Sequence, residues 1–216
     1  MDWREYADRE RECRQSDHGC SAGCIIIIDG TIIVKSLLSH HTIMCNDSDF
    51  LDLMEKRYSV RSYSSKKVEK NKIDRILRAA RIAPTAVNKQ PQRIYVLQSD
   101  EALKKASEVT RFTFGAPLIF LVCSDTKVGH VMADGQYMGT VDATIAMTQM
   151  MLEATELGLG TCWVRGFVRE EVSKKFDLPD NILPEGMLIT GYASEDSVPG
   201  RFHSDRIPSE DMVTYL

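Results

Sequence analysis

Apolar residues recur along most of the chain at the spacings of alternating helices and strands. Ile73, Ile76, Leu77 and Ala80 follow a helical period, and Pro84 ends that helix because its ring cannot continue it. The same reasoning predicts the other elements: short helices at 50–54 and 172–176, a charged helix at 100–109, strands at 94–97, 118–122 and 187–192, and an extended arm from residue 198.

The longest helical pattern runs from about residue 135 to residue 157. Val141 and Ile145 belong to an apolar stripe with further apolar residues beside it, so the helix is apolar over much of its circumference. Gly158 follows in the position of a helix-ending glycine. We expect a central, largely buried helix. The apolar run at 118–122 is typical of a strand covered on both faces.

The first 48 residues differ from the remainder. Two apolar stretches, at 24–28 and 31–34, flank Asp29-Gly30, which is a typical two-residue hairpin turn. We therefore expect two parts: an N-terminal appendage at 1–48 that contains a β-hairpin, and a main domain at 49–216.

Four of the six cysteines lie in the appendage, at positions 13, 20, 24 and 45. Their spacing does not match the C-x₂-C or C-x₂₋₄-C pairs of closed zinc and iron–sulfur sites. Unpaired thiols are the simpler interpretation, so no metal ligand is assigned. A redox or metal function of this segment stays open as an alternative.

Composition narrows the class of protein. The 216 residues are 43% hydrophobic, enough for a substantial core, and the formal net charge of −4 gives no electrostatic reason to expect nucleic acid binding. The longest apolar run is far shorter than the roughly 18 residues of a membrane span, and the N-terminus lacks the pattern of a secretory signal. We therefore expect a cytoplasmic protein with reduced cysteines and a small-molecule partner, without nucleic acid or membrane partners.

Three short motifs carry the candidate chemistry. The first covers residues 57–61, where Arg57, Ser59 and Arg61 lie on one side of an extended segment. Two planar cations and a hydroxyl on the same side suit a single anion, and phosphate is the natural ligand. A surface strand end with solvated arginines is the alternative interpretation.

The second motif is the loop at residues 84–91, between a helix and a strand. Its two prolines stiffen the chain, while Thr85, Asn88 and Gln90 offer short hydrogen-bonding groups. Such a loop suits one edge of a planar polar ligand. A capped helix-to-strand turn would explain the same residues.

The third motif covers residues 158–167 and follows the long helix. Gly158 and Gly160 allow tight backbone curvature, and the next residues can present peptide N–H groups to the plane of a ligand. The alternative is that Trp163 is an ordinary core residue.

In this order, the three motifs resemble the nitroreductase family of FMN-dependent oxidoreductases from about residue 50 to the C-terminus. The resemblance implies an α+β fold with a central mixed β-sheet flanked by helices, and a homodimer with two FMN sites at the subunit interface. Gln92 departs from the family pattern, which often has an aromatic residue there. The segment at 126–135 lies where relatives insert lids over the substrate, and its shortness predicts an open pocket.

The resemblance also assigns roles to residues of each motif. It implies that the arginines and serine of the first motif hold the FMN phosphate and ribityl chain, and that the backbone N–H of Arg165 or Gly166 faces the flavin N5. Near the C-terminus it implies that Arg206 returns to the phosphate, with Ser204 in place of a usual basic residue. The full set of expected FMN-binding residues is Arg57, Tyr58, Ser59, Arg61, Pro84, Thr85, Ala86, Asn88, Trp163, Val164, Arg165, Gly166 and Arg206.

The activity implied by the resemblance is NAD(P)H-dependent reduction of nitroaromatic, quinone or other conjugated acceptors by a ping-pong two-electron mechanism. NAD(P)H acts as a transient electron donor in the acceptor's own pocket, because the sequence has no separate G-x-G-x-x-G nicotinamide motif. No side chain is expected to act as an obligatory general base, since the cofactor supplies the chemistry. A flavin-binding module that stores or senses FMN without turnover is the alternative function.

Overall fold

The computed structural model describes residues 25–28, 31–34 and 47–216, and the chain divides into two units at Asn46 and Asp47. In the first unit, β1 (Ile25–Ile28) and β2 (Thr31–Val34) pair as antiparallel strands. Strands are thus present on both sides of the predicted hairpin turn. The turn itself and the four N-terminal cysteines lie outside the described residues.

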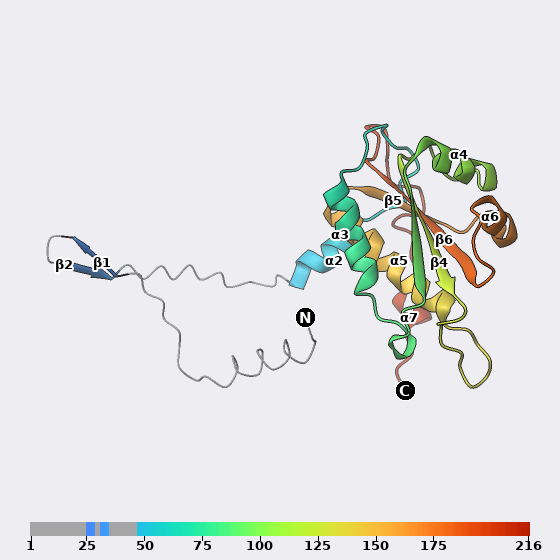
Figure 1. The fold of residues 1–216 in the computed structure, drawn as a ribbon. Helices are drawn as coiled ribbons and strands as arrows, with labels where there is room; N and C mark the ends of the chain where they lie inside the picture. The colour runs from blue at the N-terminus through green and yellow to red at the C-terminus, as the bar shows by residue number, and fades with distance from the viewer. Residues whose placement is uncertain (1–24, 29–30, 35–46) are drawn as a thin grey trace. The chain divides into compact units, whose positions relative to one another are not determined.

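A four-stranded sheet forms the centre of the second unit, with the strand order β3-β4-β6-β5 (Figure 1). Its strands are β3 (Gln92–Leu97), β4 (Leu118–Asp125), β5 (Gly160–Val164) and β6 (Ile182–Gly191).

Every neighbouring pair of these four strands is antiparallel. The expected mixed sheet is therefore corrected: in the described part of the chain, the one parallel pairing is an isolated bridge between Ser59 and Thr161. The reason is that the chain between β3 and β4, and between β5 and β6, returns to the end of the sheet that it left, so the strands joined in this way run in opposite directions.

Helices cover both faces of this sheet. The helices of this unit are α2 (Asp47–Lys56), α3 (Lys70–Arg81), α4 (Asp100–Val109), α5 (Gly139–Glu156), α6 (Arg169–Lys175) and the short α7 (Ser209–Met212). Of these, α3, α4, α5 and α6 cover the sheet. Buried side chains of α3 and α5 pack on one face, and those of α4 and α6 pack on the other. Figure 1 shows where these helices lie around the sheet. The α+β fold with helices flanking a central sheet is confirmed.

Strand β4 divides the two cores. All eight of its residues are buried, and successive side chains alternate between the faces, as the pleat of a strand requires. Leu118, Phe120 and Val122 enter the core with α3 and α5, whereas Ile119 and Leu121 enter the core with α4 and α6. The prediction of a strand covered on both faces is confirmed.

Helix α5 begins later than predicted and buries a different face. It starts at Gly139 because Gly135 has a φ of 87° and lies in a turn, where its N–H donates to the Met132 carbonyl. The predicted stripe through Val141 is partly exposed, since Val141 itself is 39% exposed. The buried positions of α5 are Gly139, Asp142, Ala143, Ala146, Met147, Met150 and Ala154.

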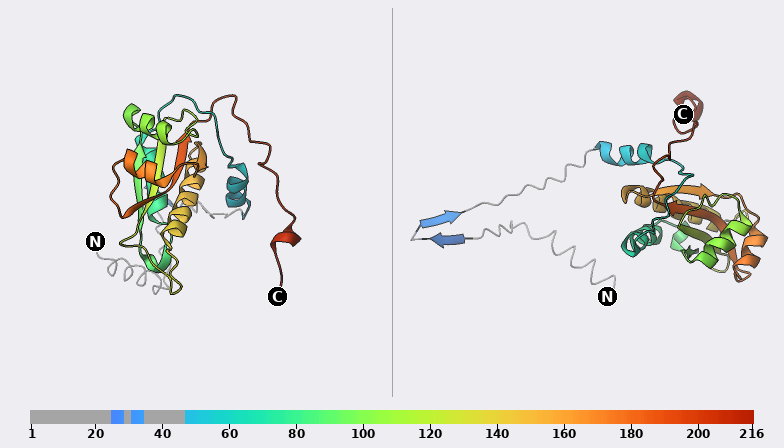
Figure 2. Two further views of the ribbon diagram at one scale, coloured as in Figure 1. Left: turned by 90° about the vertical axis from the view of Figure 1, so that its right-hand side faces the viewer. Right: turned by 90° about the horizontal axis from the view of Figure 1, so that it is seen from above.

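Beyond residue 197 the chain forms an arm that runs along and then away from the sheet and helices (Figure 2). The predicted extended arm also contains the short helix α7. Large apolar side chains of the arm are exposed, among them Phe202, Ile207, Met212 and Tyr215. Within the described residues, no helix combines the length and apolar character that a membrane crossing requires.

Candidate active site

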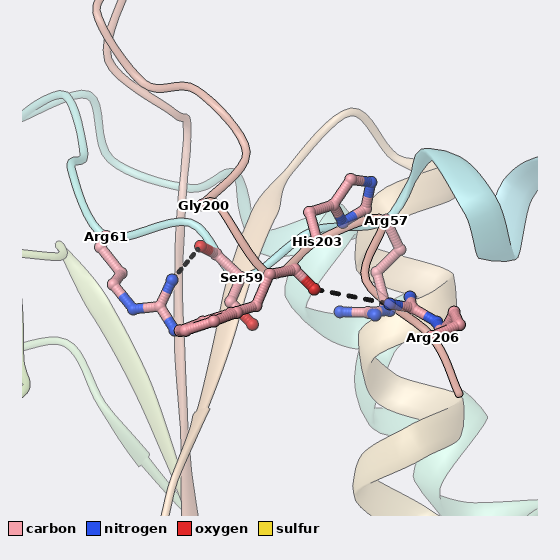
Figure 3. A pocket seen from close by; sticks show the side chains of 7 residues that line it. Arg57, Ser59, Arg61, Gly200, His203 and Arg206 are labelled. Carbon is pink, nitrogen blue, oxygen red and sulfur yellow. Dashed lines mark hydrogen bonds between the residues drawn. The ribbon is translucent and has the colours of Figure 1, made fainter. Parts of the chain in front are cut away.

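Two segments far apart in the sequence enclose a pocket of about 180 Å³ (Figure 3). Four of the predicted site residues meet there, from the first motif and from the C-terminal arm. The complete lining is Arg57, Ser59, Arg61, Gly200, Phe202, His203 and Arg206. We call this the arginine pocket.

The first motif is held against the edge strand β5. The Val60 N–H donates to the Thr161 carbonyl at 2.9 Å, and the Val60 side chain is only 1% exposed. Since side chains alternate along an extended segment, burial of Val60 directs Ser59 and Arg61 the opposite way, into the pocket. A Cβ built on Gly160 would lie 2.5 Å from the Val60 side chain, so glycine at this position permits the close approach.

The arginine pocket has an uncompensated positive charge. Arg57, Arg61 and Arg206 form no ion pair with any carboxylate of the described residues. Instead, Arg61 donates to the Ser59 carbonyl at 3.2 Å and Arg206 donates to the Asp205 carbonyl at 2.7 Å. Guanidinium groups gathered in this way repel one another, and an anion with several acceptor oxygens removes the repulsion.

Cys162, on strand β5, is a buried thiol. Burial raises the pKa of Cys162, and this effect outweighs the opposing influence of Arg61 and Arg57. No thiolate therefore competes with an incoming anion at neutral pH.

Tyr58 contacts the arm and lies outside the lining of the arginine pocket. Its hydroxyl donates to the Ser197 hydroxyl at 3.3 Å, and its ring meets the His203 ring edge-on at 6.2 Å between centroids. Tyr58 therefore fixes the place where the arm leaves the sheet, and through His203 it supports the pocket from outside.

The second motif contributes no residue to the arginine pocket. It forms a short 3₁₀ turn at Ala86–Asn88, in which Val87 has a φ of 46° and Asn88 a φ of 54°. A positive φ is unusual for a β-branched residue, so the surroundings must hold this turn in place. Pro84 and Val87 are exposed.

Side-chain oxygens accept two of the hydrogen bonds that hold this turn. The Thr85 hydroxyl oxygen accepts from the Gln90 N–H at 3.0 Å, and the Asp142 carboxylate accepts from the Ala86 N–H at 2.8 Å. Asp142 is 1% exposed and lies in the first turn of α5. Sequence reasoning did not select Asp142, because a carboxylate at a helix start is common and nothing local indicates its distant partner.

The third motif ends strand β5 and leads into an exposed turn. Trp163 is 42% exposed, and its indole N–H donates to the Met147 sulfur at 2.9 Å, which anchors one edge of the ring on α5. The Val164 side chain is buried in the core with α4 and α6, so only its backbone is available to a ligand. The alternative of Trp163 as a core residue does not describe this half-exposed side chain.

The turn at residues 165–167 leaves the Gly166 peptide donor free. The Phe167 N–H donates to the Arg165 carbonyl at 2.9 Å, and the Gly166 carbonyl accepts from the Thr110 hydroxyl at 2.8 Å. The Gly166 N–H, in contrast, has no acceptor among the described residues, and Gly166 is exposed. An exposed N–H in a turn held from behind is suited to bind an acceptor atom of a ligand.

Strand β5 connects the two parts of the site. Its residue Thr161 pairs with Ser59 beside the arginine pocket, and Arg165 begins the exposed turn. At about 3.3 Å per residue the four steps between them span roughly 13 Å. The arrangement suits one elongated ligand with an anionic end and a planar, hydrogen-bonding end.

Sequence reasoning missed other residues of the site. These are Gly200 and Phe202, which line the arginine pocket. His203 lines it as well; the sequence favours a solvated surface histidine there and leaves a share in phosphate binding open. A basic cluster near a proline is the only sequence signal for this part of the arm. Thr110, behind the 165–167 turn, has no sequence signal at all.

The fold and the site define an α+β protein with a site for an anionic, planar ligand, and comparisons with known proteins identify its family. The model of the nitroreductase family matches residues 54–111 and 110–192. A relative from Archaeoglobus fulgidus, provisionally named an NADH dehydrogenase/NAD(P)H nitroreductase, is 34% identical over 173 residues, which cover 74% of this chain and 97% of the relative.

Two further relatives agree with this match. The FMN reductase [NAD(P)H] of Bacillus subtilis is 28% identical over 181 residues, covering 73% of this chain and 71% of the relative. The crystal structure of a nitroreductase family protein from Clostridium difficile has a TM-score of 0.73 and 40% identity, covering 77% of this chain and 98% of that chain. The protein belongs to the nitroreductase family, and the resemblance carried by its three motifs is confirmed.

Proposed function

We propose that this protein is an FMN-dependent oxidoreductase that transfers two electrons from NAD(P)H to a nitroaromatic, quinone or other conjugated acceptor. For a quinone, NAD(P)H, one proton and the quinone give NAD(P)⁺ and the hydroquinone. For a nitro group, the same donor and proton give NAD(P)⁺, the nitroso compound and water. The names of the relatives, among them an FMN reductase [NAD(P)H], agree with this reaction class.

One observation carries the proposal: an arginine pocket without carboxylate partners lies at one end of β5, and an exposed turn with a free N–H lies at the other. FMN has a phosphate at one end and a flat ring with acceptor nitrogens and oxygens at the other. The donor set therefore fits FMN, with arginines and a serine for the phosphate and backbone N–H groups for the ring.

The residues of the chain bind and orient this cofactor, and bound FMN supplies the two-electron chemistry. Arg57, Arg61 and Arg206 hold the phosphate through charge-assisted hydrogen bonds. The Gly166 N–H would be a donor for the flavin ring, and such a donor would tune the ring without any titrating side chain. Trp163, fixed at one edge by Met147, closes the ring site beside this turn.

We propose that two copies of the chain form a homodimer, and that each flavin site is completed by the partner. Apolar side chains are exposed on α2, on α5 and along the arm, including Phe50, Leu51, Val141 and Met212. The 84–91 loop contributes nothing to the arginine pocket of its own chain, so it is free to approach the flavin ring bound to the other copy. Its site residues are Pro84, Thr85, Ala86 and Asn88.

The remaining parts of the proposal concern the cellular location of the protein and the boundary between its two parts. A cytoplasmic location supplies both NAD(P)H and FMN, and cell fractionation tests it. We propose the boundary between an appendage and the flavin domain near residue 48, and limited proteolysis followed by mass spectrometry tests that boundary.

The deciding experiment is anaerobic reconstitution and reduction. The purified protein is incubated with FMN, separated from free FMN, and titrated with NADH and with NADPH while the flavin absorption is recorded. We expect stoichiometric FMN, loss of the oxidised flavin band with at least one nicotinamide, and its return when a quinone is added. Protein that retains no FMN would refute the proposal, and bound FMN that neither nicotinamide reduces would refute the turnover.

A further inference from the structure

Thr110 lies directly behind the exposed 165–167 turn. It follows α4 as the residue that ends the helix, and its N–H donates to the Ala106 carbonyl at 3.1 Å. The residue is only 5% exposed. The rigid end of a packed helix therefore fixes the backbone of Thr110.

The Thr110 hydroxyl joins two segments of the chain. It donates to the Gly166 carbonyl at 2.8 Å and accepts from the Phe112 N–H at 3.3 Å. Both donor and acceptor capacity of the hydroxyl are thus in use, which is the favourable state for a buried polar group. Loss of the hydroxyl would leave the Gly166 carbonyl and the Phe112 N–H without these partners.

Phe112 supports the same turn by packing. A Cβ built on Gly166 would lie 2.6 Å from the Phe112 ring, so the ring lies directly against the glycine backbone. Only glycine permits this contact, yet glycine is also the residue with the largest backbone freedom. The direction of the Gly166 N–H is consequently set by its surroundings, through the ring of Phe112 and the hydroxyl of Thr110.

We propose that Thr110 is a positioning residue for the flavin: its hydroxyl fixes the carbonyl of Gly166 and thereby aims the free N–H of the same residue at the ring. The inference rests on the proposed function, since the ligand that the N–H serves is FMN. Thr110 itself touches neither cofactor nor substrate. It acts on hydride transfer through the orientation of one peptide donor, in the way that preorganised donors act in other active sites.

The test compares Thr110→Val with Thr110→Ser. Valine keeps the branched shape and removes the hydroxyl, whereas serine keeps the hydroxyl. Thr190→Val is the matched control, because Thr190 is fully buried and its hydroxyl also donates to a carbonyl, that of Leu188 at 3.1 Å, away from the turn. If Thr110→Val does not fold, Thr110→Ala against Thr110→Ser makes the same comparison without the added methyl group.

Two measurements are made on each variant. The first is amide hydrogen exchange of residues 164–168 in the flavin-free protein, which requires no bound cofactor. The second is the rate of flavin reduction by NAD(P)H in a single anaerobic turnover, together with the absorption spectrum of bound FMN. We expect Thr110→Val to exchange faster in this segment, to shift the flavin spectrum and to reduce flavin about tenfold more slowly, at nearly unchanged FMN affinity.

Thr110→Ser and Thr190→Val should resemble the unmodified protein in both measurements. Unchanged exchange and an unchanged reduction rate in Thr110→Val would overturn the inference, and so would a serine variant as impaired as the valine variant. If the proposed function is wrong, the measurements give a different result. The unmodified protein would then bind or reduce no flavin, while the exchange measurement would still report whether Thr110 holds the turn.

Discussion

At the scale of single residues, we expect the arginine pocket to determine which end of a ligand the protein recognises. Its three arginines lack carboxylate partners among the described residues, so their donors are available to one multivalent anion. Recognition of FMN should therefore depend on the phosphate far more than on the ring.

Replacing Arg61 by glutamine tests this dependence. A hydrogen bond to a charged group contributes about 1.5–3 kcal/mol, so we expect Arg61→Gln to weaken FMN binding roughly 10- to 100-fold. Binding of riboflavin, which lacks the phosphate, should change little. Fluorescence titration with both ligands measures the two dissociation constants.

Arg201→Gln is the control for this change. Arg201 is exposed, stacks on the Phe202 ring at 4.3 Å and does not line the pocket. An equal loss of FMN affinity in both variants would show that general surface charge, and not the arginine pocket, attracts the ligand.

The sequence predicts the first motif well because its information is local. Arg57, Ser59 and Arg61 alternate along five residues, and an extended backbone places them together without help from the rest of the fold. Thr110, Asp142 and His203 are different, since each acts on a segment that lies far away in sequence. Only the packed structure shows which of many similar side chains has such a partner.

At the scale of elements, helix α3 is joined to the end of β6 by one polar contact. The Tyr192 hydroxyl donates to the Glu69 carboxylate at 2.6 Å, and Lys66 forms an ion pair with the same carboxylate at 3.3 Å. The hydrogen bond from Tyr192, assisted by Lys66, lowers the pKa of Glu69 from its ordinary 4.5 to about 2.

This lowered pKa predicts a specific acid sensitivity. The unfolded chain takes up its proton at Glu69 near pH 4.5, whereas the folded protein does so near pH 2. The stabilising contribution is therefore complete above pH 4.5 and declines as the pH falls toward 2. Glu69→Gln should be less stable at neutral pH and should lose less stability between pH 4.5 and 2.

Urea unfolding at several pH values measures this difference. Glu156→Gln serves as control, because Glu156 is exposed and forms no ion pair with the described residues. Parallel stability curves for Glu69→Gln and the unmodified protein across this pH range would contradict the prediction.

The sequence predicts the residue ranges of the helices and strands more accurately than it predicts which face of a helix is buried. The strand at 118–122 and the helix at 100–109 are found where periodicity predicts them. The long helix is found as well, but its buried face runs through Ala143 and Met147 and not through Val141. When a helix is apolar around nearly its whole circumference, its sequence does not indicate which face is buried. The elements that pack against the helix then determine that face.

At the scale of the whole molecule, we expect separate roles for the arm, residues 198–216, and for the body, which is residues 47–197. Residues 198–216 contribute Arg206 to the pocket and several exposed apolar side chains, but no buried side chain to either core. We therefore expect the arm to serve ligand binding and association, and the body to carry the stability.

Ending the chain after Ser197 tests this division. We expect the shortened protein to keep its circular dichroism spectrum and nearly its melting temperature, because both cores remain intact. It should bind FMN at least tenfold more weakly and sediment as a monomer, whereas the full chain should sediment as a dimer. Analytical ultracentrifugation and FMN titration provide the measurements.

Loss of folding on removal of the arm would contradict the separation of roles, and a shortened protein that remains a dimer with bound FMN would contradict the assignment of the arm. The proposed dimer rests on the family resemblance, because the pattern of apolar positions alone does not reveal an interface between subunits. An exposed apolar residue such as Val141 is indistinguishable, by pattern alone, from one buried in its own chain.

Strand β4 is enclosed along its entire length by segments of its own chain. The framework of the protein is thus complete before any second subunit or cofactor is present. Substitutions in the arm or in the loops can then change which ligands bind, with little loss of stability in the sheet and its helices. Such an arrangement permits descendants of one ancestral scaffold to acquire new electron acceptors by small steps at the periphery.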